Sequence, residues 1–153
     1  MSKINGNRVL LGGLVAGVVI AVGEFIYNGL LVAGAMADAM ARFNLQGYVP
    51  GAMILYVILA FAMGIFAVWL YAALRPRFGP GARTAIYAGV AFWVASSLFQ
   101  AVSQIGIGFW PAGLLWGGAA WGLVELPLAT LAGAYIYKEG AAPQPDVADS
   151  SSF

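Results

Sequence analysis

The chain contains no cysteine and no histidine, and only 8% of its 153 residues are charged. Without cysteine there can be no disulfide, no thiol chemistry and no thiolate metal site. Without imidazole or thiolate, axial haem ligation by those groups and most zinc or copper sites are also excluded. The sequence therefore predicts no cofactor and no metal site, and a net charge of +1 gives no indication of a nucleic-acid partner.

Apolar residues are abundant instead: 62% of the chain is hydrophobic and the mean hydropathy is +0.88. A soluble domain of this length could not bury so much apolar surface. About 20 consecutive apolar residues are enough to cross the roughly 30 Å hydrocarbon core of a bilayer. Four such runs occur, at Val9 to Ala37, Ala52 to Leu74, Thr84 to Ile105 and Pro111 to Tyr137.

These runs predict an all-α membrane protein, a bundle of four transmembrane helices that interacts with the lipid bilayer. We expect residues 1–138 to form this single domain. The tail at residues 139–153 is rich in Pro, Ala, Ser and Asp, and is expected to be disordered in the cytoplasm.

The basic residues predict the orientation of the bundle. Six of the seven fall on one side of the predicted spans, namely Lys3, Arg8, Arg75, Arg77, Arg83 and Lys138. Only Arg42 falls on the other side. By the positive-inside rule both termini should be cytoplasmic. Aromatic side chains are expected to ring the inner interface, as Trp69, Tyr71, Tyr135 and Tyr137.

Two acids lie within the predicted spans, Glu24 in the first and Glu125 in the last. Counted along the helices from Arg8 and Lys138, they lie about 24 Å and 20 Å deep. Gln100 of the third span lies about 26 Å from Arg83, which places the three side chains in one layer.

Other features converge on the same layer. Asn28 lies one helical turn beyond Glu24, and Ser97 and Gln104 share the polar face of the third span with Gln100. Small residues precede each acid at the same offsets, as Gly17 and Ala21 in the first span and Gly118 and Gly122 in the last. Pro127 should bend the last helix beside Glu125. The predicted substrate- or proton-binding cluster is Glu24, Asn28, Ser97, Gln100, Gln104 and Glu125.

The chemistry of this cluster is limited by the lack of any basic residue within the spans. A charged carboxylate at the bilayer centre costs at least about 2.5 to 3.5 kcal/mol. At neutral pH one or both acids should therefore be protonated or hold a cation. One interpretation is a site that exchanges protons in a carrier. The other is a static pair, bonded to Asn28 and Gln100, which only fixes helix packing. The serines and amides of the third span equally allow hydrogen bonds that only join helices.

Three functional classes follow. The first is a small proton- or cation-coupled transporter, expected to be a homo-oligomer because four helices enclose little space. The second is a structural or accessory subunit that binds a partner membrane protein. An intramembrane enzyme is not favoured, because the serines have no Lys or His base and two glutamates without a metal match no familiar hydrolase.

In its size, its four spans and the Gly-x6-Glu pattern ending at Glu24, the chain resembles the small multidrug-resistance transporters, whose first helix carries an essential acid. It differs from them in its greater length, the second acid at Glu125 and the proline in its last span. As a whole the chain looks more like the uncharacterised four-helix proteins of bacterial inner membranes. That resemblance implies a location in such a membrane and no particular activity.

Overall fold

The computed structural model describes residues 4–137, which form helices and turns without a strand. Four helical segments are long and apolar enough to cross a membrane. The prediction of an all-α protein with four spanning helices is confirmed. Lys3, Lys138 and the predicted disordered tail at residues 139–153 lie outside the described residues.

The first span consists of α1 (Gly6–Glu24) and a π-helical segment, η1 (Phe25–Leu31). It ends six residues before Ala37, where the sequence placed its end. Val32 leaves helical geometry and its N–H bonds to the Tyr27 carbonyl oxygen at 3.0 Å. The chain then turns into a separate short helix, α2 (Ala33–Ala41).

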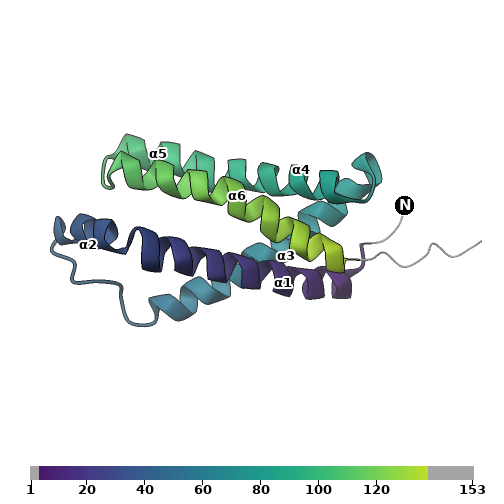
Figure 1. The fold of residues 1–153 in the computed structure, drawn as a ribbon, viewed down its shortest axis with the longest axis horizontal. Coiled ribbons are helices and arrows are strands. Elements are labelled where there is room, and N and C mark those ends of the chain that lie inside the picture. Colours follow the sequence, from purple (N-terminus) through teal and green to yellow (C-terminus); the bar gives the residue numbers. More distant parts are fainter. Residues whose placement is uncertain (1–3, 138–153) are drawn as a thin grey trace, which may run out of the picture.

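The other three spans are α3 (Ala52–Phe78), a third segment made of α4 (Ala82–Trp93), η2 (Val94–Leu98) and α5 (Phe99–Ile107), and α6 (Ala112–Ile136). The segment η2 is also π-helical, a form that is rare and often found at functional sites. In Figure 1, α6 lies beside α4 and α5 over its first half and then turns across toward α1. The bend agrees with the kink expected at Pro127, which lies inside α6.

Glycines let the helices approach closely in the half of the bundle nearer the N-terminus. A Cβ atom on Gly64 of α3 would lie 2.7 Å from the Cα of Gly17 in α1 and would also collide with Gly13. Gly12 of α1 and Gly133 of α6 meet in the same way. Small residues at these positions allow the helix backbones to touch.

The buried core occupies this same half. Its fully enclosed larger side chains are Ile20, Val68 and Leu126, packed among alanines from all four spans. Beyond the level of Glu24 the helices separate, and residues 4–137 form no comparable core there. The bundle is therefore closed at one end and open at the other.

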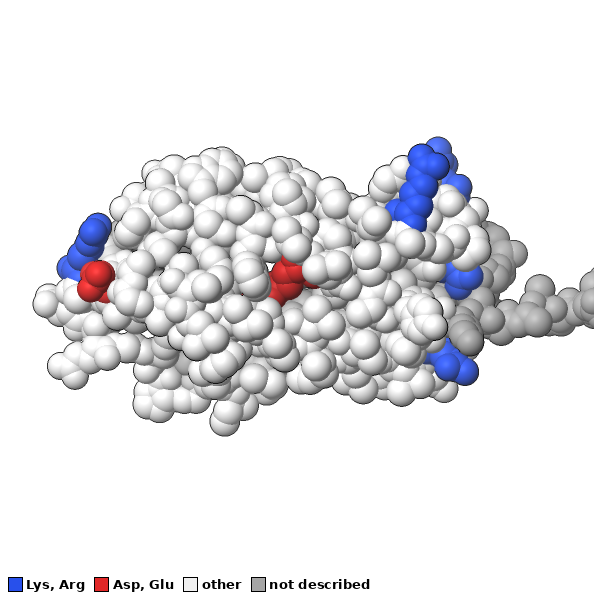
Figure 2. Space-filling view, viewed as in Figure 1, with Lys and Arg blue, Asp and Glu red and all other residues white. Residues whose placement is uncertain are grey.

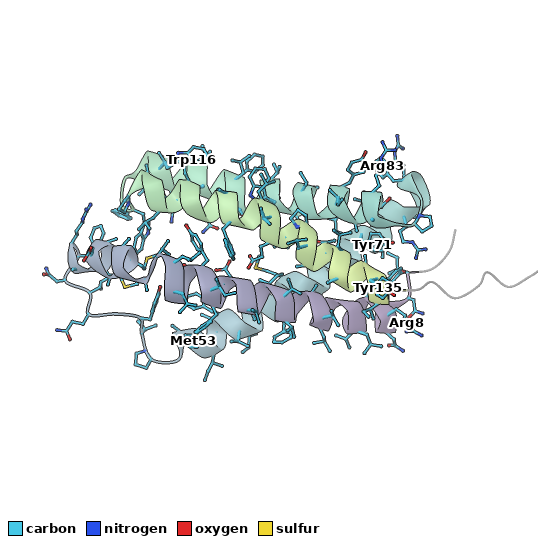
Figure 3. All side chains as sticks on the ribbon, in the orientation of Figure 1. Arg8, Met53, Tyr71, Arg83, Trp116 and Tyr135 are labelled. Atoms are coloured by element: carbon cyan, nitrogen blue, oxygen red, sulfur yellow. The ribbon has the colours of Figure 1, made fainter. Side chains whose placement is uncertain are left out.

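The labelled side chains of Figure 3 show that Arg8, Tyr71, Arg83 and Tyr135 gather at the closed end. Tyr135 is exposed, as expected of an interfacial aromatic residue, but Tyr71 and Tyr137 are only 3% and 4% exposed. Their rings flank the guanidinium of Arg75, at 5.8 and 5.3 Å from the ring centres. These two tyrosines are buried beside Arg75 rather than exposed, and their predicted place at the inner interface stays a prediction.

Candidate functional site

Glu24 and Glu125 approach each other half-way along the bundle, where the Glu125 carboxyl group lies against Gly23 beside Glu24. Glu125 is buried in α6 and only 6% exposed, whereas Glu24, the last residue of α1, is exposed. Figure 2 shows acidic atoms midway along the molecule, far from the basic residues at both ends. Two carboxyl groups can share a hydrogen bond only if one of them carries a proton.

Gly23 allows this contact. A Cβ atom at that position would collide with the Oε1 atom of Glu125 and lie 2.9 Å from its Cδ atom. The absence of a side chain therefore leaves room on α1 for the carboxyl group from α6. On the other side of α6, Gly89 of α4 admits Pro127, whose Cα atom would lie 2.5 Å from a Cβ there. The bend in α6 is thus seated between two glycines.

Each acid has a neutral hydrogen-bond donor from its own helix. The side-chain amide of Asn28 donates to Oε2 of Glu24 at 2.5 Å and to the Glu24 carbonyl oxygen at 3.3 Å. The indole Nε1 of Trp121 donates to Oε1 of Glu125 at 3.3 Å. Within residues 4–137 neither acid forms an ion pair, so these neutral donors and the second acid are the hydrogen-bonding partners of each carboxyl group.

Beside the acids lies a groove with a volume of about 330 Å³, between η1 on one side and η2, α5 and the first half of α6 on the other. Five of the six predicted site residues line it, namely Glu24, Asn28, Ser97, Gln100 and Gln104. The sixth, Glu125, is buried behind Glu24. The structure therefore brings all six predicted residues to one place.

The aromatic part of the groove was missed. Tyr27 and Trp121 line it and stack on each other, with ring centres 5.5 Å apart. Trp121 lies four residues before Glu125, a spacing that puts both on one helix face. The hydroxyl of Tyr27 donates to the Leu114 carbonyl oxygen at 3.5 Å and so reaches across to α6. Neither ring was among the predicted site residues.

The polar face of the third span is only partly used to join helices. Trp93 donates to the Ala119 carbonyl oxygen of α6 at 2.7 Å, and Ser96 donates to Phe92 within its own helix. In the part of the chain that the structure describes, the side chains of Ser97, Gln100 and Gln104 make no hydrogen bond to another helix. This counts against the interpretation of these three residues as links between helices.

The groove is accessible from the open end of the bundle. A second hollow, of about 290 Å³, lies between α2 and the loop at residues 44–51 and shares Asn28 and Met36 with the groove. Toward the closed end, the glycine contacts and the buried core described above separate the acids from the surface. Polar access to the carboxyl pair is therefore one-sided.

Comparisons of the chain with protein-family models, with curated proteins and with solved structures find no match. The likeness of the first span to small multidrug-resistance transporters remains a resemblance of sequence pattern, and the site has to be interpreted from its own chemistry.

Proposed function

We propose that this integral membrane protein is a small carrier that couples movement of a solute to a proton or cation at the Glu24–Glu125 pair. The observation that carries the proposal is the approach of two carboxyl groups midway along the spanning helices, beside an accessible groove. A pair that shares one proton can exchange that proton for a cation without placing a second net charge in the membrane.

The closed end favours a carrier over an open channel. A channel needs a continuous polar path, but the acids are separated from the closed end by packed apolar side chains such as Ile20 and Leu126. Transport would require the contact between α1 and α6 to open on that side, and the bend at Pro127 and the two π-helical segments are places where the helices can change direction.

We further propose that the closed end faces the cytoplasm of a bacterial inner membrane. Arg8 and Arg83 lie at that end (Figure 3), as do Arg75 and Arg77 in the last turn of α3. Arg42 follows α2, at the other end (Figure 1). The positive-inside rule supports this orientation. The groove would then be open to the outside in the conformation described here.

The test is proton flux in phosphatidylcholine vesicles that contain the full chain and an internal pH-sensitive dye. We expect flux under an imposed potential, and its loss in Glu24→Gln and Glu125→Gln. Asp38→Asn is the matched control, because it makes the same acid-to-amide change in an exposed residue of α2. Flux that persists in both glutamine variants would rule out the carrier.

The second candidate is an accessory subunit that pairs with itself or with a partner membrane protein. It is favoured by the first turns of α3, where consecutive large apolar residues from Met53 to Leu59 are exposed (Figure 3). If that function is correct, the acids serve only packing. The glutamine variants would then lose thermal stability rather than flux.

A further inference from the structure

We propose that the closed end of the bundle binds the headgroup of an anionic phospholipid at the corner where α3 passes into α4, with Arg77 and Arg83 on its phosphate. The inference goes beyond the proposed function and does not depend on the acid pair. Three features carry it: the unbalanced positive charge at this end, the constrained shape of the corner, and the apolar side chains beside it.

The closed end carries positive charge that no described acid balances. Four arginines lie at this end, namely Arg8, Arg75, Arg77 and Arg83. The three acids within residues 4–137 lie elsewhere, two midway along the bundle and one in α2. On the face in Figure 2, blue atoms stand at the closed end without red ones beside them, whereas the two colours adjoin at the open end. A zwitterionic headgroup would bring an ammonium group that these charges repel, so they favour an anionic one.

The corner that carries the two arginines is held in one shape. The turn between the helices has only three residues, 79–81. The hydroxyl of Thr84 donates to the Gly79 carbonyl oxygen at 2.7 Å, and the Gly81 N–H donates to the hydroxyl of Tyr71 at 3.2 Å. The two arginines therefore stand on either side of a constrained turn, where less conformational entropy is lost when a ligand binds.

Both guanidinium groups have N–H groups left for a ligand. Nε of Arg83 donates to the Tyr87 hydroxyl at 2.6 Å, and the group lies 5.4 Å from the centre of that ring. This contact uses one of the five N–H groups of an arginine. Within residues 4–137 the side chain of Arg77 forms no hydrogen bond or ion pair, and both arginines are exposed. Forked guanidinium donors match the geometry of phosphate oxygens.

Apolar side chains beside the corner would contact the acyl chains of the same lipid. Phe78 and Tyr87 are exposed, and their rings meet edge to face with centres 5.8 Å apart. Ile86, next to Tyr87 in α4, is exposed as well. Because α3 and α4 belong to spanning segments, a lipid headgroup at this corner has its acyl chains alongside them. Free phosphate would gain nothing from these contacts, which favours a lipid as the source of the phosphate.

The positive-inside rule explains the sign of the charge at this end without a bound lipid. That rule is satisfied equally by lysine. Phosphate held by forked donors is not, because lysine presents a single point charge. Replacing arginine by lysine therefore separates the two explanations while preserving the orientation of the chain.

The experiment counts the lipids bound to the intact full chain in detergent by mass spectrometry, with dioleoylphosphatidylglycerol as the probe and dioleoylphosphatidylcholine for comparison. We expect the wild type to bind phosphatidylglycerol at least about tenfold more tightly. Replacing both residues, as Arg77→Gln with Arg83→Gln, should weaken that binding roughly thirtyfold. Arg77→Lys with Arg83→Lys should weaken it at least about threefold. The control Arg42→Gln, which removes an exposed arginine at the open end, should bind as the wild type does.

Three results would overturn the inference. Equal binding of the two lipids by the wild type would show that the charge does not select a headgroup. Undiminished binding by the double lysine variant, or an equal loss in Arg42→Gln, would show that only the overall charge matters. Displacement of phosphatidylglycerol by an equal concentration of inorganic phosphate would show that the acyl chains contribute nothing. None of these results bears on proton flux, so the proposed function is judged by its own test.

Discussion

A methyl group at position 64 should separate α1 from α3. In Gly64→Ala the new Cβ atom would lie 2.7 Å from the Cα atom of Gly17 and closer still to backbone atoms of Gly13 and Gly17. Ordinary carbon contacts begin near 3.5 Å, so the helices must move apart by about 1 Å. Backbone atoms cannot rotate away as the end of a side chain can, and overpacking of this kind costs about 1 to 3 kcal/mol.

The control is Gly113→Ala in the first turn of α6, where a Cβ atom would meet nothing within 4 Å. Both variants gain the same helix propensity, up to about 1 kcal/mol, so their difference isolates the contact at Gly64. Thermal unfolding of the purified chain in detergent is the assay, with helicity followed by circular dichroism. Equal melting temperatures for the two variants would refute the description of α1 and α3 as a backbone-to-backbone contact.

Two further predictions use the same assay. The free energy of unfolding of Glu125→Gln should stay within about 1 kcal/mol of the wild-type value, because single hydrogen bonds between membrane helices average below that value. The glutamine side chain can still accept from Trp121 and donate to Glu24. A much larger loss of stability would favour the accessory subunit. Thr84→Val should lower the free energy of unfolding by about 0.5 to 1.5 kcal/mol. The reason is that the buried hydroxyl of Thr84 donates to the Gly79 carbonyl oxygen at 2.7 Å and fixes the turn before α4. An unchanged melting temperature would show that this bond contributes nothing.

The sequence could predict the spans and the depth of the acids because both follow from counting. A helix rises by a fixed length per residue, so the distances from Arg8, Arg83 and Lys138 place polar side chains in a layer whatever the packing. The layer then brings Glu24 and Glu125 together if α1 and α6 are neighbours, as they are.

Which face of each helix meets which neighbour could not be predicted in the same way. In a soluble bundle the polar face marks the outside, but here lipid and core are equally apolar. Gly17 was noted for its spacing from Glu24, yet the structure places it against Phe61 of α3. Gly23, which was not singled out, is the residue that admits Glu125. Small residues indicate that a close contact exists without identifying the partner.

The two ends of the bundle differ for a physical reason that connects the fold to the proposed function. At the closed end, glycine and alanine bring backbones together, and dispersion contacts hold the helices without polar side chains. Beyond Glu24 the helices diverge, and every polar group in the gap must find a partner in a medium that offers none. Asn28 and Trp121 each donate a hydrogen bond to one carboxyl group of the pair. The side chains of Glu24 and Gln100 remain exposed in the groove. A ligand that brings its own hydrogen-bond donors into the groove would lower the free-energy cost of these unpaired polar groups. A purely structural pair of acids would be more stable in a closed bundle without such a groove. The open groove beside the acids is therefore the feature that separates a binding site from a packing device.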